Sequence, residues 1–399
     1  MKKIRVGILF GGRSGEHEVS LLSAASVLQA IDRKKYEVVP IGITKEGRWV
    51  TAGHAERLLA GEAPMSQKHL RAGDPAATAS AAVLRRGESV LVPPVPAQAL
   101  DPFEREASAI APARSEHVLS VDVIFPVLHG TFGEDGTIQG LFELAGLAYV
   151  GSGVLGSATG MDKDAMKRLF ASAGLPIVKH VTFLRGEWEK GPKKIRARVE
   201  SALRYPVFVK PANLGSSVGI GKAHNAKELG PAIETAARFD RKIVVEQGVG
   251  GRTRKARELE VAVLGNDEPE ASVVGEVVPG KEFYDYEAKY LSEGSDLIVP
   301  AKLNRTQTKQ VREMAVAAFR ACDCAGLARV DFLMEPGAKG RAGGRIFVNE
   351  INTLPGFTSI SMYPRLWAAS GVPYPQLIDR LIHLALERRA EQDRNRYSL

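Results

Sequence analysis

Apolar residues occur in short runs along the chain, and glycine-rich turns or amphipathic stretches follow several of these runs. Residues 4–10, 36–43 and 121–128 have the composition of buried strands, and helical spacing follows in residues 21–31 and from residue 137. An alternation of strands and helices indicates an α/β fold whose first part is a doubly wound sheet.

The same pattern continues through the second half of the chain. Strands are predicted at residues 206–210, 242–249, 257–265, 328–334 and 347–352. Helices are predicted at residues 163–173, 307–325 and 375–391. Residues 53–114 are rich in alanine, proline and charge, so we expect an irregular surface excursion there.

Composition limits the class of protein. A chain of 399 residues is too long for one compact core, and 44% apolar with 25% charged residues is typical of a globular protein. The net charge is +8, but lysines and arginines are interleaved with acids, which favours a solvated surface over a nucleic-acid interface. Part of the excess charge suits anionic small ligands.

The two cysteines, Cys322 and Cys324, fall near the end of a predicted helix, where residues two apart point to different faces. We interpret them as reduced structural thiols. No apolar run approaches a membrane span, and Met1-Lys2-Lys3 leads into a strand and not into a signal peptide. We therefore expect a cytoplasmic protein that binds no membrane.

The stretch 347–356 carries the clearest candidate chemistry. Glu350 and Asn352 are two apart, so on a strand their side chains leave the same face, and Asp331 on the preceding predicted strand adds a third oxygen donor. Two carboxylates and an amide suit Mg²⁺, which often shares its ligands with nucleotide phosphates. The alternative is a hairpin whose polar residues face solvent.

Two turns in the first part of the chain carry further candidates. Glu16 lies in the glycine-rich turn after the first strand, where it is either a dipole partner of the next helix or a binding group for a substrate ammonium. His129 follows the strand 121–128; it points into a cleft or is bound within its own loop. The glycines of the first turn lack the dinucleotide spacing, so a nicotinamide site has little support.

A glycine and serine loop, residues 211–220, lies between two strands. Its amides and the hydroxyls of Ser216 and Ser217 could close over phosphates, with Lys210 at the preceding strand end, although a plain hairpin turn is the alternative. Glu246 could accept from a purine amine, whereas Glu258 and Glu260 share one strand face that could equally be solvated. Residues 283–290 have no clean periodicity and predict a long ordered loop of the kind that serves as a lid.

Taken together, these stretches resemble the ATP-grasp superfamily, and within it the D-alanine–D-alanine ligase family. The resemblance runs from the first strand to Pro364 and fails only near residues 53–114. Its segments, in chain order, are residues 11–20, 129–130, 133–136, 215–219, 284–290 and 349–364. It implies three α/β domains, expected at residues 1–151, 152–248 and 249–399, with ATP held between the sheets of the central and C-terminal domains.

The resemblance also implies roles, position by position. The residues implied for ATP, including adenine at Glu246 and ribose at Glu258, are Lys163, Lys210, Ser216, Ser217, Glu246, Glu258 and Lys289. The implied ligands of Mg²⁺, which is expected as two ions and replaceable by Mn²⁺, are Asp331, Glu350 and Asn352. The residues implied for the two D-alanines are Glu16, His129, Arg329, Gly356, Ser361 and Met362. The residues implied in catalysis are Glu16, Ser216, Arg329, Tyr290 and Gly356.

The implied reaction joins two D-alanines through a D-alanyl phosphate, for the synthesis of peptidoglycan precursors. Arg329 and the Gly356 amide would form the oxyanion hole, and a homodimer through the N-terminal domain is implied. The proton acceptor stays open between His129 and a hydrogen-bonded set of Glu16, Ser216 and Tyr290. The alternatives are D-alanyl-D-lactate synthesis, which the tyrosine-bearing lid disfavours, D-alanyl-D-serine synthesis, and a non-catalytic nucleotide-binding regulator.

Overall fold

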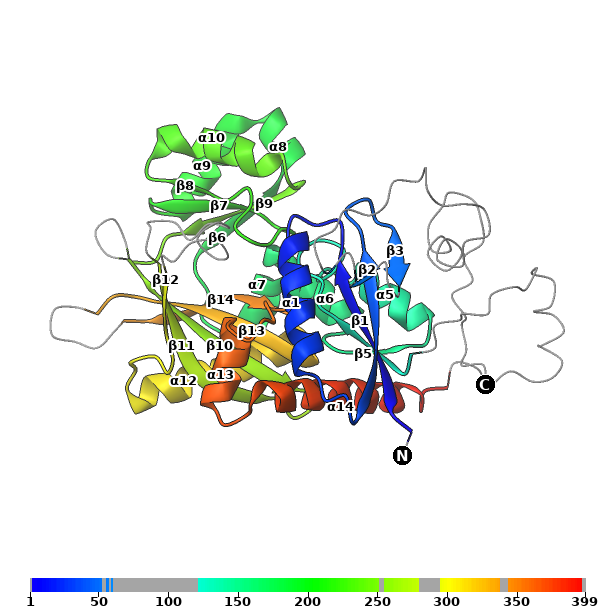
Figure 1. Ribbon diagram of the computed structural model, residues 1–399. Coiled ribbons are helices and arrows are strands. Elements are labelled where there is room, and N and C mark those ends of the chain that lie inside the picture. Colours follow the sequence, from blue (N-terminus) through cyan, green and yellow to red (C-terminus); the bar gives the residue numbers. More distant parts are fainter. Residues whose placement is uncertain are drawn as a thin grey trace.

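Three β-sheets form the framework of the chain in a computed structural model that describes residues 2–51, 55–56, 59, 121–250, 255–279, 295–337 and 344–396 (Figure 1). Each sheet is built mainly from one stretch of the sequence, in the order that the strand and helix alternation predicts. No helix within these described ranges is long and apolar enough to cross a membrane.

The first sheet has the strand order β3-β2-β1-β4-β5, parallel except for β3. Its elements are β1 Ile4–Gly11, α1 His17–Ala30, β2 Tyr36–Ile43, β3 Trp49–Thr51, β4 Val123–Pro126, α5 Thr137–Leu144 and β5 Ala148–Tyr149. The order reverses direction between β1 and β4, and ligands of such sheets bind beyond the carboxyl ends of the strands at this point. The predicted turns of Glu16 and His129 follow these two strands.

The second sheet, β6-β9-β7-β8, is antiparallel and lies at the top of Figure 1 with its helices above it. Its elements are β6 His180–Leu184, α8 Arg185–Lys190, α9 Pro192–Ala202, β7 Val207–Pro211, β8 Gly221–Ala223, α10 Ala226–Ala237 and β9 Lys242–Gln247. Two helices, α6 Val154–Met161 and α7 Lys163–Ser172, precede it. The apolar residues between this sheet and its helices form a core of their own.

The third sheet is also antiparallel, in the order β12-β11-β10-β13-β14. Its elements are β10 Arg257–Gly265, β11 Glu270–Pro279, β12 Ser295–Ile298, α12 Arg305–Ala321, β13 Gly326–Met334, β14 Ile346–Asn352, α13 Met362–Ala369 and α14 Tyr374–Gln392. Alternation along β10 places Leu259, Val261 and Val263 against α12, in one core cluster. The opposite face of β10, which carries Glu258 and Glu260, is turned away from α12.

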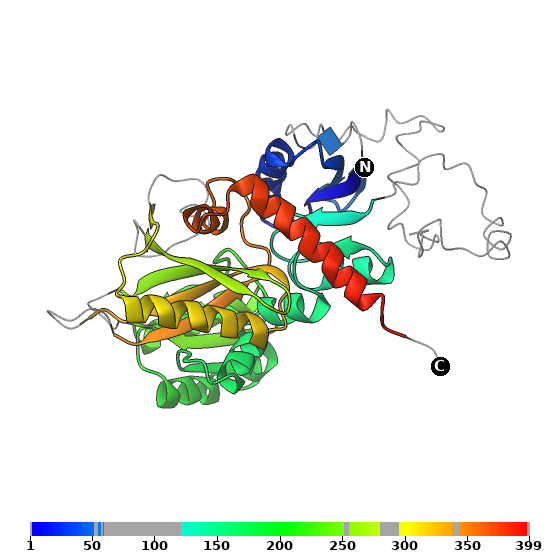
Figure 2. The ribbon, with the colours of Figure 1, turned by 90° about the horizontal axis from the view of Figure 1, so that it is seen from below.

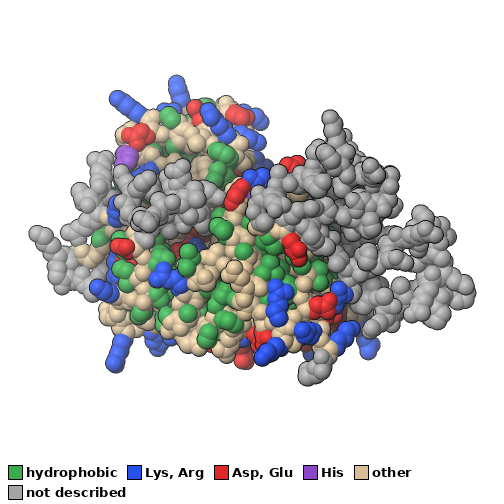
Figure 3. All heavy atoms as spheres, viewed as in Figure 1, with side chains coloured by type: hydrophobic (Ala, Val, Ile, Leu, Met, Phe, Trp, Pro, Cys, Tyr) green, Lys and Arg blue, Asp and Glu red, His purple; other side chains and the backbone are tan. Residues whose placement is uncertain are grey.

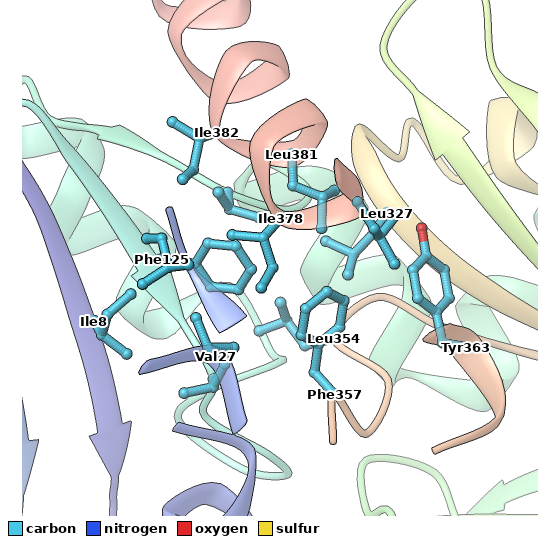
Figure 4. Close-up of a cluster of buried hydrophobic side chains, with 14 of the residues drawn as sticks. Ile8, Val27, Phe125, Leu327, Leu354, Phe357, Tyr363, Ile378, Leu381 and Ile382 are labelled. Carbon is cyan, nitrogen blue, oxygen red and sulfur yellow. The ribbon is translucent and has the colours of Figure 1, made fainter. Parts of the chain in front are cut away.

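One hydrophobic core joins the first sheet to the third. Figure 4 shows Ile8, Val27 and Phe125 of the first sheet and α1 facing Leu327 of β13 and residues of α14. Helix α14 contacts β4 and β5 as well as β10 and β13, and it crosses between the two sheets in Figure 2. The first and third sheets therefore share buried surface, whereas the second sheet has a separate core.

The predicted fold class is confirmed, and most predicted elements are present. Strands β2 and β10 have the predicted bounds, but α1 begins at His17 and not at Leu21, and α12 ends at Ala321 and not at Ala325. Asp323, with φ of 55°, is incompatible with a continuing right-handed helix. Both cysteines therefore lie just beyond the helix, as buried free thiols.

Several predictions fall outside the described residues. These are the lid at 283–290 with Lys289 and Tyr290, nearly all of the excursion at 53–114, and residues 338–343 of the connection before β14. The domain boundaries at 151/152 and 248/249 stay a prediction. On the face drawn in Figure 3, lysine and arginine side chains are dispersed among acidic and apolar ones.

Candidate active site

A cleft of ≈ 410 Å³ is lined by residues attached to all three sheets. The predicted site residues that line it are Glu16, Lys163, Ser216, Arg329, Glu350, Asn352, Gly356, Ser361 and Met362. Of the other described residues with a predicted role, none is part of this lining; they are His129, Lys210, Ser217, Glu246, Glu258 and Asp331. The fold thus brings together residues that are more than 340 positions apart in sequence, such as Glu16 and Met362.

The turns after β1 and β4 are joined where the first sheet meets the cleft. Glu16 is the N-cap residue of α1, and the Ser14 hydroxyl donates to the carbonyl of His129 at 2.6 Å. Gly130 has φ of 75°, and a Cβ atom there would lie 2.7 Å from Glu16 Oε2. Glycine at this position therefore lets the second turn approach the Glu16 carboxylate.

His129 and Glu134 are buried beside Glu16, and we call these three residues the acidic cluster. Nδ1 of His129 is 3.0 Å from the Leu354 carbonyl oxygen and 3.6 Å from Glu134 Oε1, and Nε2 is 3.1 Å from Ser23 Oγ. Its ring is thus held from outside its own loop as well as within it. Direct contact of His129 with a substrate stays a prediction.

The acidic cluster has shifted proton affinities. Burial lowers the pKa of His129, but the carboxylates of Glu134 and Glu16 outweigh burial and leave the pKa raised. Burial raises the pKa of Glu134. Glu134 lines the cleft, yet sequence reasoning assigned it no role; its one signal was its place in the matched segment 133–136.

The glycine and serine loop at residues 211–220, which we call the flap, connects the antiparallel strands β7 and β8. In topology it is therefore a hairpin connection. Ser216 and Ser217 have φ of 51° and 59°, a region that costs a residue other than glycine about 1–3 kcal/mol. The Ser216 hydroxyl donates to Glu16 Oε1, which ties the flap to the first sheet. Backbone strain of this kind concentrates at ligand-binding loops.

Three lysines surround Glu246 under the flap, and we call these four residues the lysine cluster. Glu246 on β9 pairs with Lys167 Nζ at 3.0 Å and with Lys210 Nζ at 2.8 Å. Lys163 Nζ donates to the carbonyl of Leu214, in the flap, at 2.7 Å. Three ammonium groups lie beside the flap, where they could pair with phosphates, and the carboxylates of Glu246, Glu350 and Glu258 are near enough to act on them.

Proton affinities in the lysine cluster follow from this pairing. Burial would raise the pKa of Glu246, but Lys167 and Lys210 outweigh burial and hold the pKa at about 2. Burial lowers the pKa of Lys163. For Lys210, burial lowers the pKa, but Glu246, Glu350 and Glu258 reverse that effect and leave the pKa raised.

The predicted metal ligands lie on neighbouring strands of the third sheet. Asp331 on β13 is directly opposite Glu350 on β14, and a bulge beside this pair makes Asn349 an extra residue. The main-chain N–H of Leu354 donates to Asn352 Oδ1 at 3.0 Å and thereby fixes the direction of that amide. Lys167 Nζ donates to the Asn349 carbonyl at 3.2 Å, which links the bulge to the lysine cluster.

This donor set fits a hard divalent cation. It offers two carboxylates and one amide oxygen on one face of adjacent strands, with Glu350 and Asn352 exposed in the cleft. Within the described ranges, no three His, Cys, Asp or Glu side chains form a group that could hold a metal ion; the predicted set has two carboxylates and the amide of Asn352.

Hydrogen-bond donors lie beside the predicted metal ligands. Arg329 lines the cleft and donates from Nε and Nη2 to the two oxygens of Asp331, each at 2.7 Å. Ser361 is the N-cap of α13, so the first N–H groups of this helix, beginning at Met362, face the cleft. A helix N-terminus is a suitable site for a carboxylate.

Comparisons with known proteins identify the family of this chain. A family model described as D-ala D-ala ligase N-terminus matches residues 5–152, and one described as D-ala D-ala ligase C-terminus matches residues 169–383. A D-alanine–D-alanine ligase of Natranaerobius thermophilus is 47% identical over 400 residues, covering 99% of this chain and 98% of that protein. One of Bacillus cytotoxicus is 45% identical over 399 residues and covers 100% of both.

Solved structures lead to the same family. The D-alanine-D-alanine ligase from Coxiella burnetii has a TM-score of 0.74 and 33% identity, covering 98% of this chain and 97% of that one. The VanG D-Ala:D-Ser ligase from Enterococcus faecalis has a TM-score of 0.74 and 34% identity, covering 96% of this chain and 100% of that one. The resemblance predicted from sequence is confirmed: this chain belongs to the D-alanine–D-alanine ligase family.

Proposed function

We propose that this protein ligates two D-alanines into D-alanyl-D-alanine with ATP, through a D-alanyl phosphate, and so supplies peptidoglycan synthesis. The observation that carries the proposal is the single cleft in which Glu16, the flap and Arg329 meet. A carboxylate, a strained loop and a guanidinium lie in one cleft, and we assign them to an ammonium, to phosphates and to an oxyanion. A nucleotide-binding regulator would need no oxyanion donor.

ATP is assigned to the lysine cluster and the flap. Lys163 and Lys210 contact its phosphates, and Ser216 and Ser217 close over them. The end of β9 binds the purine edge with Glu246 as an acceptor, and Glu258 binds the ribose. Electrostatics support this assignment, because the Glu258 carboxylate contributes to the raised pKa of Lys210. The residue proposed to bind the ribose is therefore near a residue proposed to bind the phosphates.

Asp331, Glu350 and Asn352 would hold Mg²⁺, which we expect as two ions that Mn²⁺ could replace. When bound, the metal neutralises charge on the phosphates during transfer. The proposal is supported by the oxygen-only donor set described above.

The first D-alanine binds with its ammonium at Glu16, which also accepts a hydrogen bond from the Ser216 hydroxyl. His129 interacts electrostatically with Glu16 within the acidic cluster. The carboxylate oxygen of this D-alanine attacks the γ-phosphorus of ATP, the bond to the bridging oxygen breaks, and ADP leaves. Lys163 and Lys210 spread the charge of this transfer, which needs positioning more than covalent help.

The second D-alanine binds with its carboxylate at the N-terminus of α13, through Ser361 and Met362. Its neutral amine attacks the carbonyl carbon of the acyl phosphate, and Arg329 with the Gly356 amide stabilises the tetrahedral oxyanion. Phosphate leaves with one oxygen of the first D-alanine. The lid residues Lys289 and Tyr290 are proposed to reach the γ-phosphate and the Glu16–Ser216 pair.

The reaction is placed in the cytoplasm, where ATP is made, and the two free thiols are compatible with a reducing compartment. A homodimer formed through the first domain is proposed from the family alone.

Incubation of the protein with ATP, Mg²⁺ and D-alanine tests the function, with phosphate and dipeptide measured together. Parallel reactions contain D-lactate or D-serine, since the similar VanG structure is a D-Ala:D-Ser ligase. We expect one D-alanyl-D-alanine per phosphate, with no mixed product above about a tenth of it. Glu350→Gln should abolish both products. ATP binding without turnover for any acceptor would refute the proposal in favour of a regulator.

A further inference from the structure

We propose that Glu260 is a positioning residue for Arg329, holding its guanidinium in the direction that serves the oxyanion. This inference rests on the proposed ligase function and adds a residue to it. Glu260 lines the cleft, and its Oε2 atom lies 3.1 Å from Arg329 Nε. Both side chains are largely buried, with 12% and 16% of their surfaces exposed.

Strand register makes this contact specific. Glu260 on β10 is directly opposite Asp331 on β13, and Asp331 is directly opposite Glu350 on β14. Three carboxylates therefore form one row across three adjacent strands, on the face that borders the cleft. Arg329 stands two positions from Asp331 on the same face, diagonal to Glu260.

Like charges directly opposite one another destabilise a sheet, so this row needs cations within it. Arg329 supplies one positive charge between Asp331 and Glu260. An exposed lysine could also offset the repulsion between these carboxylates, but its ammonium would be mobile. A buried arginine between two carboxylates is fixed in direction. The charge balance and the geometry therefore both favour a held guanidinium.

Asp331 and Glu260 interact with Arg329 in different ways. Asp331 accepts from Nε and Nη2 and is also a proposed metal ligand, so its oxygens are shared. Glu260 is outside the proposed donor set and forms an ion pair with the guanidinium at Nε, on the side opposite to the hydrogen bond that Nε donates to Asp331. With that side held, the direction of the remaining N–H groups is fixed, which is the requirement for a preorganised oxyanion donor.

The first test compares two variants of Glu260. Glu260→Leu removes the carboxylate beside Nε, and we expect kcat to fall about 100-fold, the scale for losing one oxyanion donor, with KM for ATP within about threefold. Glu260→Gln keeps the size of the side chain but removes its charge, so its kcat should lie between those of Glu260→Leu and the wild type. A merely structural role would change thermal stability without this split between kcat and KM.

A double-mutant cycle shows whether Glu260 acts through Arg329. In an Arg329→Met background, Glu260→Leu should lower kcat by less than about twofold further, because no guanidinium remains to be positioned. A further large loss in that background would overturn the proposal, since Glu260 would then act directly on metal or substrate.

Binding supplies a readout without turnover. A phosphinate analogue of the dipeptide carries charged oxygen on tetrahedral phosphorus, and its Kd should rise about 30-fold in Glu260→Leu while the Kd of ATP stays constant. Glu276→Leu is the matched control: Glu276 pairs with Arg257 at 2.6 Å on the opposite face of the same sheet, so its loss should leave kcat and both Kd values unchanged.

The outcomes separate this inference from the proposed function. If the wild type makes no dipeptide, the ligase proposal fails. If the wild type is active and Glu260→Leu keeps kcat within twofold, only the role of Glu260 is refuted. Equal loss of kcat in Glu260→Leu and Glu276→Leu would likewise refute it, as a general effect of removing a buried ion pair.

Discussion

The lysine cluster and the acidic cluster border the same cleft but hold their charges differently. In the lysine cluster, the charged groups come from α7, β7 and β9, and Glu246 binds two ammonium groups directly. In the acidic cluster, Glu16, His129 and Glu134 come from turns after β1 and β4. Ser14 joins the main chain at Glu16 to that at His129, whereas Ser23 and Leu354 hold the His129 ring.

The difference indicates a division of labour. Charges that are paired internally on regular elements contribute to folding as well as to ligand binding, because removing one partner leaves a buried charge. Charges on turns that end at a cleft contribute mainly to binding. Variants in the lysine cluster should therefore affect both ATP use and stability, and replacement of Glu16, the member of the acidic cluster proposed to contact D-alanine, should affect D-alanine binding alone.

The largest effect is expected for Lys210→Met. It removes a proposed phosphate contact and one of the two cations on Glu246, so kcat/KM for ATP should fall about 10²- to 10³-fold. Initial-rate kinetics with varied ATP measure it, with Lys227→Met on the exposed surface of α10 as the control. A fall in kcat/KM for ATP of less than tenfold would contradict the assignment of ATP to the lysine cluster.

Lys167→Met should act mainly on stability. The side chain is fully buried between Glu246 and the Asn349 carbonyl, so its loss should lower the free energy of unfolding by about 3 kcal/mol. Urea titration followed by circular dichroism measures this change. A loss under about 1 kcal/mol would mean that water replaces the ammonium, contrary to the account of an internally paired cluster.

Glu16→Gln should raise KM for the first D-alanine about 30-fold and leave KM for ATP within about twofold, because one charge-assisted contact to an ammonium is lost. Thermal unfolding of the variant should match the wild type. Glu18→Gln is the control, because Glu18 is an exposed neighbour on α1 that pairs with Lys45. An equal rise in both KM values would show that Glu16 does not act on D-alanine alone.

The smallest expected effect is a loss of folding stability at low pH. The pKa of Glu246 is about 2 in the folded protein and 4.5 in its reference state, so its stabilisation is complete above 4.5 and lost as pH falls toward 2. At pH 3.5 the loss should be about 1 kcal/mol, and Glu246→Gln should remove this part of the pH dependence. Glu234→Gln on α10 is the control, and an unchanged slope in Glu246→Gln would contradict the assignment.

Local pattern predicted much of the fold. The apolar runs of β2 and β10 have clear turn signals at both ends, and their predicted bounds were correct. Helices α10 and α13 were not predicted, because Pro231 and Pro364 interrupt short stretches that only tertiary packing holds in helical form. Strand β11 was missed as well, although its apolar run at 273–278 was a usable signal.

The site residues likewise divide into those that the sequence predicted and those that it did not. Motif resemblance identified the residues that line the cleft, such as Glu16, Arg329 and Glu350. It did not identify Glu260 or Glu134, whose importance depends on strand register and loop packing between distant segments. Lys167 follows Lys163 by four positions on one helix, so a search for i, i+4 partners would have found it.

The central claim is that the cleft activates D-alanine by phosphoryl transfer to its carboxylate. D-Alanine labelled with ¹⁸O in both carboxylate oxygens tests it directly, with the released phosphate analysed by mass spectrometry. The account predicts one ¹⁸O atom in the phosphate for each dipeptide formed, because the bond from the D-alanine oxygen to phosphorus survives the amine's attack. Unlabelled phosphate accompanying dipeptide would contradict it, since the carboxylate would then never have been phosphorylated.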